Sequence, residues 1–124
     1  MHLGAFSMSL NVSDLAASKA FYEKLGFDAF HDQSDQGWCM LRQGDTVIGL
    51  FGGFIERNTL TFNPGWTQSA ENVAGDFDDV RTIQARLKAA GLELTQECDP
   101  DGEGPAHIAL LDPDGNAILI DQHR

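Results

Sequence analysis

Two of the four histidines stand where they could move a proton. His123 follows Asp121 by two positions near the end of an apolar run, and side chains two apart on a strand share a face. Either an Asp–His pair or a histidine at the surface or at a dimer contact fits this spacing. His107 lies inside another apolar run, either as a partly buried imidazole with satisfied hydrogen bonds or as a ligand contact. His107 and His123 are therefore the candidate general bases, whereas His2 and His31 lie near a terminus and a polar loop and are expected to be solvated.

Large aromatic side chains form a second set of candidates. Trp38, Phe51, Phe62 and Trp66 could stack on a flat or cationic ligand. Two of them, Phe62 and Trp66, belong to the segment Phe54–Ser69, in which no helix or strand periodicity persists. The aromatic residues of this segment either cover a ligand cavity or pack between halves of the chain or at a dimer contact.

The two cysteines, Cys39 and Cys98, lie far apart and match no short-spaced metal or redox motif. We expect both to be free thiols packed in or beside strands. Sequence alone assigns no base to either, so a nucleophilic role is the weaker interpretation.

Composition bounds the size of the fold and the classes of partner. With 124 residues and 42% hydrophobic content, the chain can bury one core, and two separate domains would each be marginal. A formal net charge of −11 argues against binding nucleic acid or an anionic membrane surface. It fits either an acidic solvated surface or a cationic ligand. No signal peptide and no apolar run near the ~20 residues of a membrane span is visible, so a cytoplasmic protein is expected.

The pattern predicts two similar series of elements. The first is a strand, a capped helix, a short strand and a hairpin, at Ala5–Val12, Leu15–Leu25, Phe27–His31, Trp38–Arg42 and Thr46–Phe51. The second repeats this order at Ala70–Phe77, from Val80 to Ala90, Leu92–Cys98, His107–Leu111 and Ala117–Gln122. Ser13 or Asp14 is expected to cap the first helix, and Gly26 and Gly91 to end the two helices.

The chain is therefore interpreted as one β-α-β-β-β unit written twice, an α+β fold with a mixed sheet. We expect a single domain over residues 1–124, with a first half-unit at about 1–55, a linker at about 56–69 and a second half-unit at about 70–124.

Several motifs, in the right order, resemble the vicinal oxygen chelate superfamily over nearly the whole chain. They are the helix entry Asn11-Val12-Ser13-Asp14-Leu15, the run Phe21-Tyr22-Glu23-Lys24-Leu25-Gly26-Phe27 and the ending Asp112-Pro113-Asp114-Gly115-Asn116. That superfamily contains glyoxalase I, extradiol dioxygenases, and fosfomycin and bleomycin resistance proteins. The resemblance implies two half-units whose sheets curl around a cavity, the glyoxalase/bleomycin resistance fold, and a homodimer.

Metal-dependent members of that superfamily hold a divalent ion with His and Glu side chains on the first and last strands of each half. Carried over to this sequence, the four ligand positions fall on Ser7, Gly49, Asn72 and Leu119. None is a histidine or a carboxylate, so neither a metal at this place nor any other cofactor is expected.

Residues that share a strand face with these four positions define the expected ligand cavity. A mixed apolar and polar wall of this kind suits a small molecule. Counting by twos adds these residues: Ser9, Asn11, Val47, Phe51, Ala74, Asp76, Ala117, Asp121 and His123. Together with the aromatic and histidine candidates, the predicted ligand-binding residues are Ser7, Asn11, Trp38, Gly49, Phe51, Trp66, Asn72, His107, Leu119 and Asp121.

The resemblance implies two functions of different kinds. The first is a metal-free protein that binds or sequesters a small organic molecule, cationic or aromatic, as bleomycin resistance proteins do. The second is a glyoxalase-related lyase or a dioxygenase with a displaced metal site that includes His107, His123 and nearby aspartates. An accessory protein whose important surface is external is a third interpretation.

Overall fold

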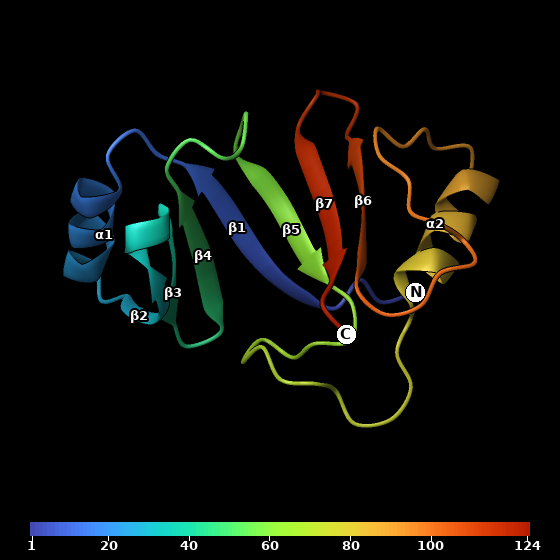
Figure 1. Ribbon diagram of the computed structural model, residues 1–124, viewed down its shortest axis with the longest axis horizontal. Coiled ribbons are helices and arrows are strands. Elements are labelled where there is room, and N and C mark those ends of the chain that lie inside the picture. Colours follow the sequence, from blue (N-terminus) through green and yellow to red (C-terminus); the bar gives the residue numbers. More distant parts are fainter. The chain divides into compact units, whose positions relative to one another are not determined.

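The computed structural model describes residues 1–124 and contains seven strands and two α-helices, which confirms the predicted α+β class (Figure 1). In chain order the elements are β1 (Ala5–Asn11), α1 (Leu15–Lys24), β2 (Asp28–Gln33), a single 3₁₀ turn (Ser34–Gln36), β3 (Trp38–Gln43), β4 (Thr46–Phe51), β5 (Thr59–Asn63), α2 (Val80–Ala89), β6 (Ala106–Leu111) and β7 (Ala117–Gln122). Neither helix is long and apolar enough to cross a membrane.

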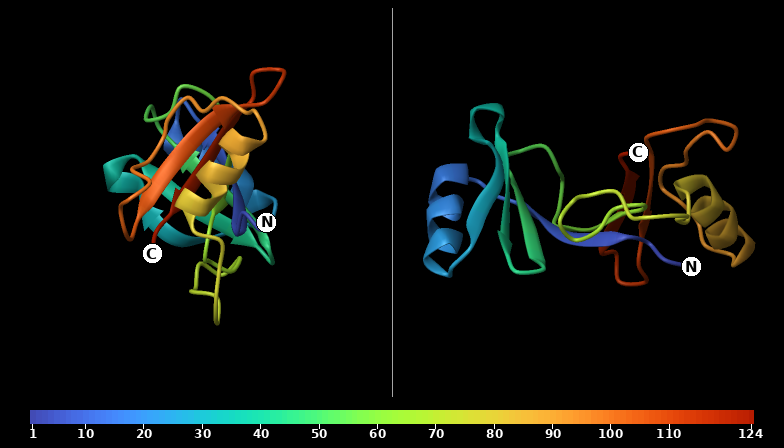
Figure 2. Two further views of the ribbon diagram at one scale, coloured as in Figure 1. Left: turned by 90° about the vertical axis from the view of Figure 1, so that its right-hand side faces the viewer. Right: turned by 90° about the horizontal axis from the view of Figure 1, so that it is seen from below.

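The chain divides into two compact units. The N-terminal unit is Ser7–Thr59, and the C-terminal unit joins Met1–Phe6 to Leu60–Arg124. Strands follow the order β2-β3-β4-β1 in the N-terminal unit, where β1 is parallel to β4, and the order β5-β7-β6 in the C-terminal unit. Each helix lies beside the strands of its own unit (Figure 2).

A small apolar core holds α1 to the sheet of the N-terminal unit. Cys39 and Leu41 of β3 and Leu50 of β4 have no exposed surface, and Leu15 and Tyr22 of the helix pack against them. No residue of α1 is itself fully buried. Burial of strand residues therefore supplies most of the hydrophobic stabilisation of this unit.

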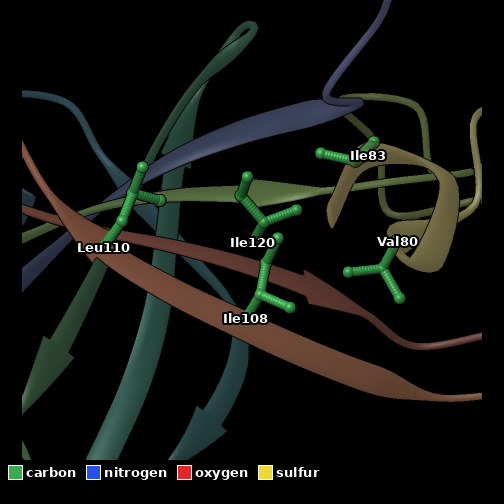
Figure 3. Close-up of a cluster of buried hydrophobic side chains, with 5 residues drawn as sticks. All are labelled: Val80, Ile83, Ile108, Leu110 and Ile120. Atoms are coloured by element: carbon green, nitrogen blue, oxygen red, sulfur yellow. The ribbon is translucent and has the colours of Figure 1, made fainter. Parts of the chain in front are cut away.

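The corresponding core of the C-terminal unit lies between α2 and the β6–β7 hairpin (Figure 3). Val80 and Ile83 of the helix meet Ile108 and Ile120 of the strands, and all four are at most 1% exposed. The buried Gln122 adds polar contacts, because its side-chain oxygen accepts from the Val80 backbone N–H at 2.8 Å. This bond satisfies an amide that the helix itself leaves without a partner.

Both helices begin and end as predicted. Asp14 caps α1 through a 3.0 Å bond to the Ala17 amide, and Asp79 caps α2 through the Arg81 amide. Gly26 and Gly91, which follow the last turns, have φ of 98° and 87°. The left-handed conformation lets the chain turn away from each helix at little cost.

Two predicted strands of the second half are wrong. Thr59–Asn63 supplies the strand that precedes α2, whereas 70–77 forms a loop with a single bridge between Trp66 and Asn72. Gly75 and Ala70 there adopt positive φ, which a strand does not allow.

The expected strand at 92–98 is reduced to one bridge, between Gln96 and Ala109. The side chain of Gln84 on α2 explains the loss. Its amide donates to the Cys98 carbonyl at 3.0 Å and accepts from the Cys98 N–H at 2.8 Å, so the backbone groups of Cys98 bond to a helix side chain instead of a strand.

Candidate functional site

The predicted site residues fall into two groups, one in each unit. The N-terminal unit contains Ser7, Asn11, Trp38, Gly49 and Phe51. The C-terminal unit contains Trp66, Asn72, His107, Leu119, Asp121 and His123.

In the N-terminal unit these residues lie on the sheet face that points away from α1. Gly49 of β4 is paired with Ser9 on one side and with Met40 on the other, and paired residues point to the same face. The neighbouring row pairs Asn11 with Phe51 and Phe51 with Trp38. Pairing thus brings Asn11, Gly49, Phe51 and Trp38 together, while the apolar core occupies the opposite face.

Neighbouring side chains crowd the position at which Gly49 would carry a metal-ligating side chain. A Cβ atom built there would lie 2.7 Å from Cε2 of Phe51 and 2.9 Å from the sulfur of Met40, both closer than real Cβ contacts. The ring of Phe51 and the thioether of Met40 fill the volume in which a His or Glu would stand. Its backbone φ is not in the left-handed region, so packing and not backbone conformation disfavours a side chain here, and Phe51 or Met40 would have to move to admit one.

Three aromatic rings stack along this face. The rings of His31 and Trp38 are 5.3 Å apart and inclined by 15°, and those of Trp38 and Phe51 are 6.3 Å apart and inclined by 16°. Trp38 and Phe51 are partly buried and His31 is exposed, so part of the stack is open within its unit. We call these three residues the aromatic stack.

A β-bulge puts His31 in the aromatic stack. Ala29 pairs with Leu41, but the register then shifts, and His31 pairs with Met40. Regular alternation would instead have paired His31 with Cys39, on the core face. Bulges commonly re-aim a side chain in this way near functional sites. The expectation that His31 is simply solvated is therefore incomplete, because the residue is exposed but stacks on Trp38.

Polar residues flank the aromatic stack on β1. Ser7 and Ser9 are 5% and 7% exposed, and they alternate along the strand with apolar core residues. Asn11 is exposed, and its backbone N–H donates to the side chain of Asn58 at 2.9 Å. This side of the face thus offers hydroxyl and amide groups, with no carboxylate or histidine.

In the C-terminal unit the predicted residues line the face of the β6–β7 hairpin away from α2. His107 pairs directly with Asp121, and Ala109 pairs with Leu119. His107 is exposed, which corrects the expectation of a partly buried imidazole. The amide of Asn63 on β5 donates to the Asp121 carbonyl oxygen at 2.8 Å and fixes the end of β7.

Of the two alternatives for His123, the structure forms the Asp–His pair at the end of β7. His123 Nε2 lies 3.2 Å from Asp121 Oδ2, and the imidazole stacks on Trp66 with centroids 4.5 Å apart and planes inclined by 11°. The hydrogen bond to Asp121 raises the pKa of His123, against a smaller opposing effect of burial. Trp66 and Asp121 are thus joined through His123, while Asn72 touches this group only through its bridge to Trp66.

A pocket of about 350 Å³ lies beside Trp66 in the C-terminal unit. Its apolar wall is formed by Trp66, Val73, Ala74 and Phe77, and its polar groups come from His2, Asp76 and Asp78. Backbone of Gly4 and Gly65 completes it. Of the predicted residues only Trp66 lines this pocket.

The surroundings of the two cysteines disfavour the reactive thiolate form. Both are free thiols, as predicted, and burial raises the pKa of the Cys39 and Cys98 side chains. A thiol is nucleophilic only as the thiolate, which a raised pKa disfavours.

The donor set does not fit a divalent metal. Three of the ligand positions that the resemblance implies, Ser7, Gly49 and Leu119, carry a hydroxyl, a glycine and an aliphatic side chain. The fourth, Asn72, was expected on the first strand of the second half and is misplaced, because 70–77 is a loop. The strand that precedes α2 is β5, and it contains no histidine or carboxylate. Neither unit brings together three or more His, Cys, Asp or Glu residues that could hold an ion. The Asp121–His123 pair, with His107 beside it, falls short of such a group.

Sequence reasoning missed His31 and Met40, and nothing in the sequence signals the bulge that turns His31 toward Trp38. Of the pocket residues it named Trp66, and it placed Ala74 and Asp76 on the cavity face, although on a strand that is not formed. The turn Asn63-Pro64-Gly65 was a further signal, and it is formed with a 3.2 Å bond from the Trp66 N–H to the Asn63 carbonyl.

The family model of the Glyoxalase/Bleomycin resistance protein/Dioxygenase superfamily matches residues 2–120. A curated relative from Vibrio parahaemolyticus serotype O3:K6, named probable lactoylglutathione lyase, is 31% identical over 93% of this chain and 87% of its own.

Two solved structures share the fold. A chain from Legionella pneumophila named NAD-dependent benzaldehyde dehydrogenase is 16% identical with a TM-score of 0.71, over 96% of this chain and 99% of its own. A glyoxalase/bleomycin resistance protein/dioxygenase superfamily member from Vibrio splendidus 12B01 is 16% identical with a TM-score of 0.61, over 94% and 96%. At such identities the likeness concerns the fold alone. From the family model and the curated relative, the chain belongs to the Glyoxalase/Bleomycin resistance protein/Dioxygenase superfamily.

Proposed function

We propose that this protein binds a small organic molecule with a flat aromatic part, and that it does so without the divalent metal used by other members of its superfamily. The observation that carries the proposal is at Gly49, where the ring of Phe51 and the sulfur of Met40 occupy the place of a metal ligand. Instead of metal donors, the same face presents the aromatic stack and the exposed Asn11, with the nearly buried Ser7 and Ser9 beside them.

Stacking explains why the ligand is expected to be flat. The rings of Trp38 and Phe51 are nearly parallel, and a planar ligand placed along them continues the same arrangement. Such contacts contribute about 0.5–1.5 kcal/mol beyond area burial, which corresponds to about two- to tenfold in affinity. Polar groups of β1 would orient the ligand, as the few polar groups of small-molecule sites usually do.

A matched pair of probes tests this proposal. Calorimetric titration with 2-naphthol and with decahydro-2-naphthol compares two ligands that share a skeleton and a hydroxyl but differ in the π system. We expect 2-naphthol to bind two- to tenfold more tightly, and Trp38→Leu to remove the difference. Equal affinities, or a preference that survives in Trp38→Leu, would contradict the role of the stack. Phe21→Leu, which removes an exposed ring on α1 outside both sites, serves as the control and should keep the preference.

Metal content is tested separately. Protein purified without chelators and analysed by mass spectrometry should hold no stoichiometric nickel, zinc, iron or manganese. An ion bound at one per chain, and lost on replacing His107 or His123, would contradict the proposal and favour a displaced metal site.

Lyase activity is the second candidate, because the relative from Vibrio parahaemolyticus bears the name of a probable lactoylglutathione lyase. For this candidate the Asp121–His123 pair is the proposed general base, since Asp121 orients the imidazole and stabilises its charged form. A lactoylglutathione lyase assay with added divalent metals decides between the two. Turnover that is abolished in His123→Gln would support the lyase, whereas absence of turnover under all metals supports the binding protein.

A further inference from the structure

We propose that the pocket of the C-terminal unit is a second binding site, which takes a small organic amine with an apolar body. It depends on residues other than the aromatic stack and is independent of the function proposed for that stack. Its volume of about 350 Å³ falls in the range of small-molecule pockets, which begins near 300 Å³.

The walls of this pocket are held in place by close backbone packing. Gly65 has φ of 82°, and a Cβ there would lie 2.7 Å from Cδ of Arg124 and 3.0 Å from the ring of Phe77. Gly4 has φ of 88°, and a Cβ there would lie 2.0 Å from the Asn63 carbonyl oxygen. Both positions therefore exclude any side chain, so these parts of the wall are fixed before a ligand arrives.

Hydrogen bonds close the loop that carries the apolar wall. The Val73 N–H donates to the Gly65 carbonyl oxygen at 2.9 Å, and the guanidinium of Arg124 donates to the same oxygen at 3.0 Å. Arg124 also lies over the ring of Phe77 at 4.5 Å, and His123 stacks on Trp66. Two aromatic walls of the pocket are thus each packed from one side, which limits the entropy lost on binding.

Two carboxylates line the pocket, and only that of Asp76 is available to pair with a ligand. Asp78 already accepts from the His2 backbone N–H at 2.8 Å and faces Arg86 at 3.8 Å. Arg124 is engaged by the Gly65 carbonyl and the Phe77 ring, as described above. Asp76 has no hydrogen bond or ion pair, and it is exposed at the pocket.

These features select the ligand chemistry. An ammonium group can pair with Asp76, while an apolar body packs on Trp66, Val73 and Phe77. A neutral molecule of the same shape would keep the apolar contacts and lose the ion pair. Since Asp76 is exposed, the ion pair should change affinity by only about two- to fivefold.

The test uses 2-phenylethylamine and its neutral counterpart 2-phenylethanol. Trp38→Phe leaves Trp66 as the single tryptophan of the two in the chain, so its fluorescence and indole N–H signal report on this pocket alone. Both probes, titrated to millimolar concentration, should perturb Trp66, and the amine should bind about two- to fivefold more tightly at low salt.

Variants separate the site from general charge effects. Asp76→Asn should abolish the preference for the amine, whereas Asp101→Asn, an exposed aspartate in another loop, should keep it. Ala74→Phe, which fills the pocket from an exposed wall position without adding a tryptophan, should abolish binding of both probes. The proposal is overturned if neither probe perturbs Trp66, if both bind equally, or if Asp76→Asn leaves the preference unchanged. None of these results bears on the Trp38 experiment, which uses the other unit.

Discussion

Replacement of Gly49 by alanine tests whether packing has closed the position of the family's metal ligand. The added methyl would lie 2.7 Å from Cε2 of Phe51 and 2.9 Å from the sulfur of Met40. Forcing extra volume into a packed site costs about 1–3 kcal/mol. Alanine also lowers the conformational entropy of the unfolded chain, which stabilises the folded state by about 0.4–1 kcal/mol. This gain applies here because the backbone φ at Gly49 suits an L residue. We therefore expect a net loss of about 1–2 kcal/mol in the free energy of unfolding.

Urea denaturation followed by circular dichroism measures this loss. With a slope of about 2 kcal/mol per molar for a chain of this size, the midpoint should fall by about 0.5–1 M. Gly102→Ala is the matched control, because its φ is also outside the left-handed region and its nearest neighbour would lie at 3.4 Å. That variant should stay within about 0.5 kcal/mol of the wild type.

A double-mutant cycle identifies the atoms responsible. Met40→Ala removes one of the two crowding atoms. The double variant Gly49→Ala/Met40→Ala should therefore lose less free energy of unfolding than the two single variants lose together, by at least about 0.5 kcal/mol. If Gly49→Ala is as stable as the wild type, or if the two changes are additive, the site has room for a side chain and the packing argument is refuted.

Three further predictions concern single residues of the two units. Gln122→Leu should lower the free energy of unfolding, measured in urea, by about 2 kcal/mol or more. The reason is that the buried Val80 N–H loses its acceptor and Asp79 loses a donor. An unchanged free energy of unfolding would contradict this role of Gln122. The pKa of His123, followed by NMR, should be above its usual value and should fall in Asp121→Asn. Because the raised pKa belongs to the folded state, the His123–Asp121 pair stabilises the protein at low pH, and this stabilisation is lost as pH rises through the folded pKa. The wild type should therefore exceed Asp121→Asn in free energy of unfolding by an amount that shrinks as pH rises. A difference that grows with pH would contradict the role of the pair. Cys39, which has no exposed surface, should react with Ellman's reagent only on unfolding when measured in Cys98→Ser, and rapid labelling of the native protein would contradict this.

Local signals in the sequence were enough to predict most elements. Asp14 and Gly26 bound α1 because capping and left-handed turns are properties of single residues. The hairpin β6–β7 followed from the turn at Asp112 to Gly115, where the Gly115 N–H bonds to the Asp112 carbonyl at 3.0 Å. The Asp121–His123 pair followed from the period of a strand, and the structure forms it at 3.2 Å.

Predictions failed where a distant side chain or a change of register decided the outcome. The strand expected at 92–98 lost its hydrogen bonds to Gln84, which approaches from α2 and not from a neighbouring strand. The segment 70–77 has strand-like residues but adopts positive φ at Ala70 and Gly75. Neither effect is encoded in a short window of sequence, because both depend on residues that meet only in the folded chain.

For the candidate sites, the sequence by itself determined which side chains are available. It supplied no histidine or carboxylate at Ser7, Gly49, Asn72 or Leu119, and it supplied the tryptophans and the acidic residues. Tertiary structure alone decided how they are used. A shifted register turned His31 onto Trp38, packing filled the space at Gly49, and a folded loop gave Trp66 a pocket with Asp76 at its edge. The physical reason is that residue type fixes the chemistry a position can perform, whereas strand register and loop packing fix which groups lie within reach of one another.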